Sequence, residues 1–202
     1  DVYKRQECDV ASDESIKALI KQVDEQWGEL DFLVHSLAYA DTQDLSKPFS
    51  ETLRDGFNKA MEISAYSLLP LAKGVIPMMR KRGGGSIVSM SFIGSTLAVP
   101  NYNVMGPAKA ALESCTRYLA RELGPENIRI NSLSPGAIRT LSSAGIKDIS
   151  EMIRVAGEHS AMKRTATQAE VANTAAFLLS DAASGITGQL IYVDCGYSIM
   201  AN

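Results

Sequence analysis

The sequence has few of the residue types that build metal sites, disulfide frameworks and catalytic triads. Its 202 residues include three cysteines and two histidines. Cys8, Cys115 and Cys195 are an odd, widely separated set without metal-ligand spacing. His35 and His159 lie too far apart in the sequence to suggest a metal site or a triad. We therefore expect no metal centre, no catalytic histidine and a reducing, cytoplasmic location.

Long apolar runs and an excess of positive charge are also missing. The longest apolar stretch, 67–77, is far shorter than the ~20 residues of a membrane span, and Lys73 and two prolines interrupt it. No signal-peptide pattern opens the chain. The formal net charge of −3 argues against nucleic-acid binding, which usually rests on a basic patch. We expect neither a membrane nor a nucleic acid as a partner.

The residues that are present predict one α/β domain. Hydrophobic residues make up 46% of the chain and charged residues 21%, which is ordinary for a globular protein. Short β-rich runs alternate with longer amphipathic stretches, a pattern typical of crossover units on a parallel sheet. The predicted buried strands are 31–36, 86–91, 128–133 and 189–194. The expected fold is a Rossmann-like, doubly wound parallel sheet with helices on both faces.

Helical patterns fill the gaps before the second strand. Ser12 precedes apolar residues at helical spacing, which predicts a capped helix that ends near Gly28. The segment 50–82 predicts one long helix or a broken pair, and three glycines end it. Pro70 and Pro77 each remove a backbone donor, so we expect kinks or a boundary there.

Two further helices are predicted in the second half of the chain. The first covers 102–123. The stretch 140–166 is weakly patterned and is expected to be irregular, as a segment over a binding site would be. A helix then covers 167–179, with Thr167 as N-cap and Glu170 three residues later.

The chain begins in an unusual place for this kind of fold. Residues 7–10 read as an acidic turn between the end of a strand and the first helix. Doubly wound folds bind dinucleotides through a first strand, a glycine-rich turn and a helix N-terminus, and no such turn precedes this helix. The glycine cluster 83–85 lies before a strand and is interpreted as an ordinary turn. We expect a sheet without its first βαβ unit, with 1–6 outside the pattern and 7–202 as a partial domain.

One pair of side chains carries a chemical signal. Tyr102 and Lys109 lie seven residues apart at the start of a predicted helix, so both can point into one cleft. An ammonium group favours the phenolate and brings the pKa of a nearby phenol closer to the working pH. Ser91, at the end of the preceding strand, could line the same cleft. An isolated pair is more often coincidence than a site, so the surrounding sequence decides.

That surrounding sequence resembles a known family. The segment 91–114, SFIGSTLAVPNYNVMGPAKAALES, is similar to the catalytic strand, loop and helix of enoyl-acyl-carrier-protein reductases, a divergent branch of the short-chain dehydrogenases. This branch carries Tyr and Lys seven residues apart where other members carry them four apart, and no Tyr here has Lys four residues later. The resemblance runs from about 7 to about 200 through ECDV, LVHSLAYA, EISAYS, SPGAIRTL and IYVDCGYSI.

The resemblance implies an oxidoreductase of type II fatty acid biosynthesis. It would reduce the carbon-carbon double bond of trans-2-enoyl-acyl-carrier-protein thioesters with NADH. The acyl carrier protein would be its partner, and the chain would form a homotetramer through its long helices and last strand. The alternatives are a carbonyl-reducing relative such as a 3-oxoacyl reductase, which the Tyr–Lys spacing disfavours, and a noncatalytic fragment, because the absent unit would hold the pyrophosphate.

The resemblance also implies roles for individual residues. Tyr102 and Lys109 would be catalytic, and Lys109 would also hold the nicotinamide ribose. Ala40 would lie beside the acyl substrate, whereas Tyr39 could be only a packing aromatic. The expected cofactor-binding residues are Asp9, Val10, Leu37, Lys109, Ile138, Arg139, Thr140, Leu141 and Ser142.

Two positions depart from the family pattern. Phe92 stands where many bacterial members have a second tyrosine, but one branch tolerates Phe there, so activity is not excluded. Cys195 stands where the family usually has glycine. We expect a packing effect at Cys195, because free cysteine usually behaves as a small buried hydrophobe.

Overall fold

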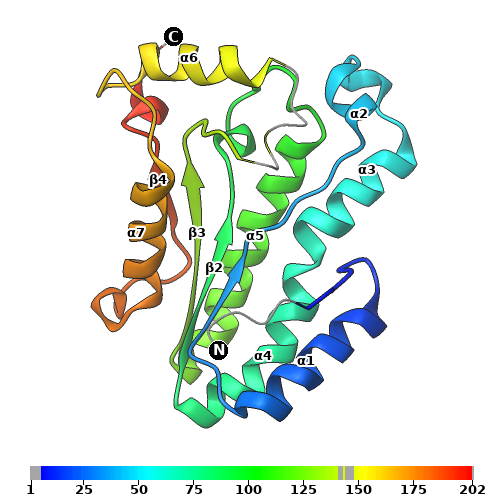
Figure 1. The fold of residues 1–202 in the computed structure, drawn as a ribbon, viewed down its shortest axis with the longest axis vertical. Helices are drawn as coiled ribbons and strands as arrows, with labels where there is room; N and C mark the ends of the chain where they lie inside the picture. The colour runs from blue at the N-terminus through cyan, green and yellow to red at the C-terminus, as the bar shows by residue number, and fades with distance from the viewer. Residues whose placement is uncertain (1–5, 141–142, 144–147, 202) are drawn as a thin grey trace.

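A computed structural model describes residues 6–140, 143 and 148–201, and its centre is a four-stranded sheet (Figure 1). The strands are β1 (Phe32–His35), β2 (Gly85–Met90), β3 (Ile128–Pro135) and β4 (Leu190–Val193). They lie in the order β1-β2-β3-β4, and all neighbours are parallel. All four predicted strands are confirmed. Within the described ranges, no strand precedes the first helix.

Helices cover both faces of this sheet, which confirms the predicted fold class. The α-helices are α1 (Asp13–Trp27), α2 (Thr42–Ser46), α3 (Arg54–Met61), α4 (Leu68–Arg82), α5 (Met105–Leu123), α6 (Ile149–His159) and α7 (Gln168–Leu179). Short 3-10 helices are η1 (Phe49–Glu51), η3 (Ile93–Ser95), η4 (Gly124–Glu126), η6 (Asp181–Ala183) and η7 (Tyr197–Ile199). In Figure 1, α4 and α5 lie on one side of the sheet and α7 on the other, while α2 and α6 lie beyond the carboxyl ends of the strands.

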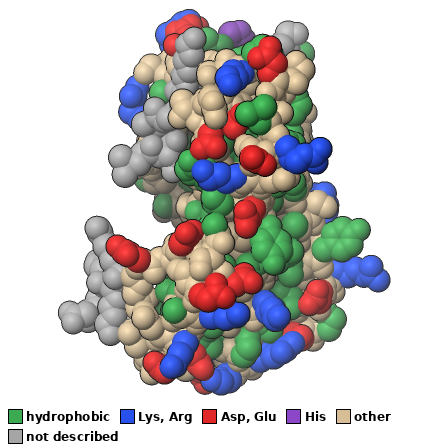
Figure 2. Space-filling model, turned by 90° about the vertical axis from the view of Figure 1, so that its right-hand side faces the viewer, with side chains coloured by type: hydrophobic (Ala, Val, Ile, Leu, Met, Phe, Trp, Pro, Cys, Tyr) green, Lys and Arg blue, Asp and Glu red, His purple; other side chains and the backbone are tan. Residues whose placement is uncertain are grey.

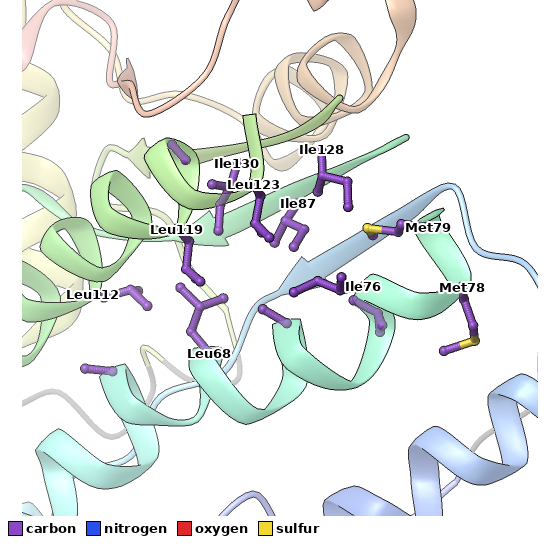
Figure 3. Packing of buried hydrophobic residues seen from close by; sticks show 14 residues of the cluster. Leu68, Ile76, Met78, Met79, Ile87, Leu112, Leu119, Leu123, Ile128 and Ile130 are labelled. Carbon is purple, nitrogen blue, oxygen red and sulfur yellow. The ribbon is translucent and has the colours of Figure 1, made fainter. Parts of the chain in front are cut away.

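The two faces follow from the alternation of side chains along each strand. Ile87 and Ile130 pack with α4 and α5, whereas Val88 and Leu133 point to the opposite face and pack with α7. Figure 3 shows the first of these clusters, in which Leu68 and other side chains of the two helices meet the sheet. Each fully buried aliphatic side chain contributes about 1.5–3 kcal/mol. This packing fixes α5 against β2.

Two predicted helix starts are confirmed by their caps. The Ser12 hydroxyl accepts a hydrogen bond from the Ser15 backbone N–H and begins α1. At α7, the Thr167 hydroxyl accepts from the Glu170 backbone, and the Glu170 carboxylate accepts from the Thr167 backbone in return. Both motifs satisfy backbone donors that the first helical turn leaves free.

The predicted helix over 50–82 is a broken pair, but the break is not at a proline. Residues Glu62–Tyr66 form a π-helical turn between α3 and α4. Pro70 lies in the first turn of α4, where its missing N–H costs little, and Pro77 lies inside the helix. The π-helical turn contains Tyr66, whose carbonyl an ordinary helix would bring against the Pro70 ring. Gly83 ends α4 with a φ of 84°.

One predicted helix start and one predicted irregular stretch are wrong. The helix expected from residue 102 begins at Met105, because Asn101 and Asn103 have positive φ, which a right-handed helix cannot contain. The stretch expected to be irregular contains α6. Its apolar residues at Ile149, Met152 and Ala156 are spaced as on one face of a helix, so the sequence held the signal.

The prediction that all four strands are buried is also wrong at an edge of the sheet. Phe32 and Val34 of β1 are 52% and 42% exposed. They point to the face that α7 covers, but α7 packs mainly against β2, β3 and β4. Over the part of the chain that the structure describes, no helix is long and apolar enough to cross a membrane. Acidic and basic side chains are interspersed on the face shown in Figure 2.

Candidate active site

A cavity of about 430 Å³ opens where three strands end. Residues 36–38 follow β1, residues 90–92 end or follow β2, and residues 135–138 end or follow β3, and all of them line it. Residues at the start of α5 and residues of α2 and α6 complete the wall. In open parallel sheets, ligands bind beyond the carboxyl ends of the strands. The position and size of the cavity therefore favour a small-molecule site.

A second cavity of about 560 Å³ lies next to the first. Phe92, Ala137 and Met152 line both of them. Its remaining wall is largely apolar and includes Leu97 and Val155. The two spaces offer an apolar surface on either side of Phe92.

Tyr102 is buried in the wall of the first cavity. Its ring packs on Phe92, with ring centres 4.8 Å apart and planes tilted by 57°. Burial raises the pKa of the Tyr102 phenol well above its usual value, and the nearby Glu113 carboxylate raises it further. The predicted lowering of this pKa is therefore wrong, because desolvation disfavours the phenolate. Tyr102 is a neutral hydrogen-bond donor.

Lys109 lines the same cavity from the second turn of α5. Its Nζ donates to the carbonyl of Met90 at 2.7 Å. Burial lowers the pKa of Lys109 to about 8, and the Glu113 carboxylate acts in the opposite direction. An ammonium group has three N–H donors, so the bond to Met90 leaves donors for a ligand. As the spacing predicts, Tyr102 and Lys109 meet in one cavity.

Two buried polar side chains adjoin this pair. His35, at the end of β1, places Nε2 2.8 Å from the Ser67 hydroxyl. Burial and, to a smaller extent, the charge of Lys109 lower the pKa of His35 to about 4, so His35 is neutral at neutral pH. Glu113 accepts a hydrogen bond from the Ser91 hydroxyl at 2.5 Å. The sequence prediction missed Glu113, although it lies four residues after Lys109 and therefore on the same face of the helix.

Comparison with known proteins identifies the family. The family model described as "Enoyl-(Acyl carrier protein) reductase" matches residues 2–198. The NADH enoyl-acyl-carrier-protein reductase FabI of Nostoc sp. is 51% identical over 193 residues, which are 96% of this chain and 74% of that protein. The FabI of Bacillus subtilis is 45% identical over 96% of this chain and 74% of that protein. The chain belongs to the enoyl-acyl-carrier-protein reductase family.

Solved structures of the enoyl reductase family agree with this assignment. The crystal structure of the NADH-dependent enzyme from Aquifex aeolicus has a TM-score of 0.93 and 43% sequence identity, covering 96% of this chain and 76% of that one. The enzyme from Anaplasma phagocytophilum, solved in complex with NAD, has a TM-score of 0.92 and 40% identity, with 96% and 74% covered. This chain therefore has the enoyl reductase fold over about three quarters of the relatives' length.

Several residues expected to bind ligands in an enoyl reductase line the first cavity. Leu37 and Ala40 reach it from the segment after β1, and Ile138 and Thr140 from the segment after β3. Arg139 lies between the last two but does not line the cavity. Its guanidinium donates to the Ser150 hydroxyl at 2.6 Å, and its carbonyl accepts from Gln168 at 2.9 Å. The assigned roles remain predictions.

The other expected residues lie elsewhere or outside the described residues. Asp9 and Val10 line neither cavity. Asp9 begins the turn into α1, where its carboxylate accepts from the Ala11 N–H at 3.0 Å. This contact stabilises the turn before the N-cap Ser12 and leaves the predicted adenine contact open. Leu141 and Ser142 lie outside the described residues.

The structure shows the environment of the two atypical positions of this reductase and of Tyr39. Phe92 separates the two cavities and holds the Tyr102 ring. Cys195 has a φ of 56°, a conformation that favours glycine and strains other residues. The Tyr39 hydroxyl donates to Asp41 at 2.7 Å, and Lys59 Nζ lies 4.5 Å from the Tyr39 ring centre. Tyr39 therefore belongs to a polar cluster at the cavity wall and is not only a packing aromatic.

Proposed function

We propose that this chain is an NADH-dependent oxidoreductase that reduces the carbon-carbon double bond of trans-2-enoyl-acyl-carrier-protein thioesters. Family membership supports the reaction. The single observation that carries the proposal is that Tyr102 and Lys109 share one cavity at the carboxyl ends of three parallel strands. In this reading, the enzyme serves type II fatty acid biosynthesis.

The cavity suits the nicotinamide end of NADH. Lys109 supplies buried N–H donors for the ribose hydroxyls, and Leu37 and Ile138 line the same space. Gly136 lies so close to Asp194 that an added Cβ would stand 3.1 Å from the Asp194 Cα, so a glycine here lets the segment after β3 pack against the residue that follows β4. When bound, NADH supplies the hydride that the β-carbon of the substrate receives.

Tyr102 stabilises the charge that this transfer creates. Negative charge develops on the thioester oxygen as an enolate, and the Tyr102 hydroxyl donates a hydrogen bond to that oxygen. The raised pKa of Tyr102 keeps the phenol protonated and able to donate. Stabilisation of a developing oxyanion by one positioned donor contributes about 3–4 kcal/mol. A proton added at the α-carbon completes the saturated product.

The partners follow from the same reading. The substrate arrives on the acyl carrier protein, and the apolar walls around Phe92 and Met152 accept its acyl chain. The chain assembles as a homotetramer through its long helices and last strand. The cytoplasmic location expected from the sequence remains a prediction.

The test is the decrease in NADH absorbance with crotonyl-coenzyme A, compared with acetoacetyl-coenzyme A. We expect turnover with the enoyl thioester, a loss of about 100-fold or more in kcat for Tyr102→Phe, and little turnover with the oxoacyl thioester. Preference for the oxoacyl substrate would instead identify a carbonyl reductase. No turnover and no NADH binding by fluorescence titration would identify a noncatalytic fragment.

A further inference from the structure

A line of buried polar contacts joins α5 to the end of β2. Lys109 and Glu113 lie one helical turn apart on the inner face of α5. Lys109 Nζ donates to the carbonyl of Met90 at 2.7 Å, and the hydroxyl of the next residue, Ser91, donates to Glu113 at 2.5 Å. Two successive turns of α5 therefore bind two consecutive residues, Met90 and Ser91. These contacts fix the register of α5 against the strand.

The contact continues deeper between the same elements. The Thr116 hydroxyl, one turn beyond Glu113, lies 3.1 Å from the Ser89 hydroxyl and 3.0 Å from that of Ser132. These three hydroxyl groups are fully buried and satisfy one another. A fully satisfied buried network specifies one geometry. Glu113 thus lies one helical turn from a second, fully satisfied polar contact between α5 and the sheet.

Glu113 is nevertheless an unusual member of that contact. Its side chain is 6% exposed. None of the ion pairs within the described ranges includes it. A buried carboxylate costs free energy unless hydrogen bonds and an opposite charge stabilise it. Its charge acts on both side chains of the pair: it opposes the lowering of the Lys109 pKa by burial, and it adds to the raising of the Tyr102 pKa.

We propose that Glu113 is a positioning residue, which acts as the buried counter-charge of the Lys109 ammonium and, through the Ser91 hydroxyl, as the anchor of the end of β2. The inference rests on the proposed function, since Lys109 is the residue expected to hold the cofactor. The anchor bears on the reaction because Phe92, which packs on Tyr102, directly follows Ser91. Glu113 touches neither substrate nor cofactor in this account.

The groups around Lys109 leave Glu113 as its anionic neighbour among the described residues. His35 faces Lys109 from β1 and is neutral near neutral pH, because burial and the Lys109 charge lower its pKa to about 4. Tyr102 precedes α5 and is also neutral, because burial and Glu113 raise its pKa. Met90 offers a carbonyl dipole from β2. Removal of the Glu113 charge should therefore be felt directly at Lys109.

The experiment follows the Lys109 ammonium by NMR in the unliganded chain, labelled at its lysine side chains. Lys109→Met assigns the signal, and the midpoint of its titration is measured in the wild type and in Glu113→Gln. The glutamine keeps the shape and an acceptor for Ser91 but removes the charge. We expect the midpoint to fall by about one pH unit or more, as loss of a neighbouring opposite charge requires. Glu122→Gln, on the exposed side of the same helix, should leave it unchanged.

A purely structural role for Glu113 predicts a different result. Folded Glu113→Gln would then be less stable but would titrate at the wild-type midpoint, and this outcome overturns the proposal. Glu113→Asp, which keeps the charge but withdraws it by one methylene, should give an intermediate midpoint. If Glu113→Gln does not fold, a wild-type midpoint in folded Glu113→Asp overturns the proposal as well.

The NMR measurement separates this inference from the proposed function. A shifted Lys109 midpoint without any turnover of crotonyl-coenzyme A would support the Glu113–Lys109 coupling and contradict the reductase activity. Turnover with an unshifted midpoint would do the reverse. In the active enzyme, the alkaline limb of the pH profile of kcat should move to lower pH in Glu113→Gln, because Lys109 loses its proton earlier.

Discussion

At the scale of single residues, burial shifts three titratable side chains around the first cavity. It raises the pKa of Tyr102 and lowers those of Lys109, to about 8, and of His35, to about 4. In each case the charged form loses hydration and the neutral form is favoured. Near neutral pH the cavity wall therefore contains a neutral phenol and an ammonium group that Glu113 helps to keep charged, with the neutral imidazole of His35 buried nearby.

His35 makes the stability of the protein depend on pH. Its pKa is about 4 in the folded chain and 6.5 in the unfolded chain, so the unfolded chain binds more protons between these values. The stability from neutral His35 is complete above pH 6.5 and is lost as the pH falls toward 4. The loss amounts to about 3 kcal/mol.

The variant His35→Gln keeps a hydrogen-bonding partner for Ser67 but does not titrate. Urea unfolding of both proteins from pH 7 to pH 4 measures the effect. We expect the wild type to lose about 3 kcal/mol more than the variant over this range. Parallel curves would show that His35 is not protonated on unfolding.

The sequence was informative about which residues meet, but not about their ionisation. The seven-residue spacing of Tyr102 and Lys109 predicted a shared cleft, and both line one cavity. The predicted fall in the Tyr102 pKa was wrong, because it considered the neighbouring cation and not the burial beside Phe92. Burial depends on packing between segments far apart in the chain. Only the spacing from Lys109 could have pointed to Glu113.

At the scale of elements, two glycines let η3 approach the start of α5. An added Cβ on Gly94 would stand 2.4 Å from the Tyr102 ring, and one on Gly106 would stand 2.7 Å from the carbonyl oxygen of Gly94. The second contact involves backbone on one side, so neither element can yield by a simple side-chain rotation. This close approach places Phe92 and Tyr102 together.

Gly106→Ala should therefore force the two elements apart. We expect a loss of about 1–3 kcal/mol in the free energy of unfolding, as for other overpacked sites, together with a lower kcat. Gly124→Ala is the matched control at the other end of α5, because nothing lies within 4 Å of its added Cβ. It should leave stability unchanged or raise it by up to about 1 kcal/mol. Equal effects of the two substitutions in denaturant titrations would refute the close-contact argument.

The element boundaries show what local patterns can and cannot predict. Ser12 and Thr167 were predicted as caps and are caps, because capping depends on neighbouring residues alone. The start of α5 was misplaced because Asn101 and Asn103 adopt positive φ. The Asn103 side chain donates to two carbonyls at the end of α2, those of Leu45 and Lys47. These partners are more than fifty residues away in sequence, beyond the reach of a helical pattern.

At the scale of the whole molecule, the parallel sheet gathers the site from distant parts of the chain. The ends of β1, β2 and β3 meet at one cavity because all strands point the same way (Figure 1). This convergence was predictable once the strands were recognised. The exposure of Phe32 and Val34 was not, because it depends on how far α7 extends across the sheet.

The proposed tetramer is a testable property at this scale. Tyr118, on the outer side of α5, is 73% exposed, although an aromatic ring of this size favours burial. We expect sedimentation equilibrium to give the mass of four 21.7 kDa chains, and Tyr118→Glu to shift the distribution to smaller species. Lys21→Ala, on the exposed side of α1, should not change the mass. A wild-type monomer at micromolar concentration would contradict the assembly.

The most direct test of the central claim is the fate of the transferred hydride. The wild-type chain is incubated with crotonyl-coenzyme A and NADH that carries deuterium on the transferring face of its nicotinamide, and the product is analysed by mass spectrometry. The proposed reaction gives butyryl-coenzyme A with one deuterium at the β-carbon, formed at least about 100-fold more slowly by Tyr102→Phe. Unchanged crotonyl-coenzyme A, or a rate that does not depend on Tyr102, would contradict it.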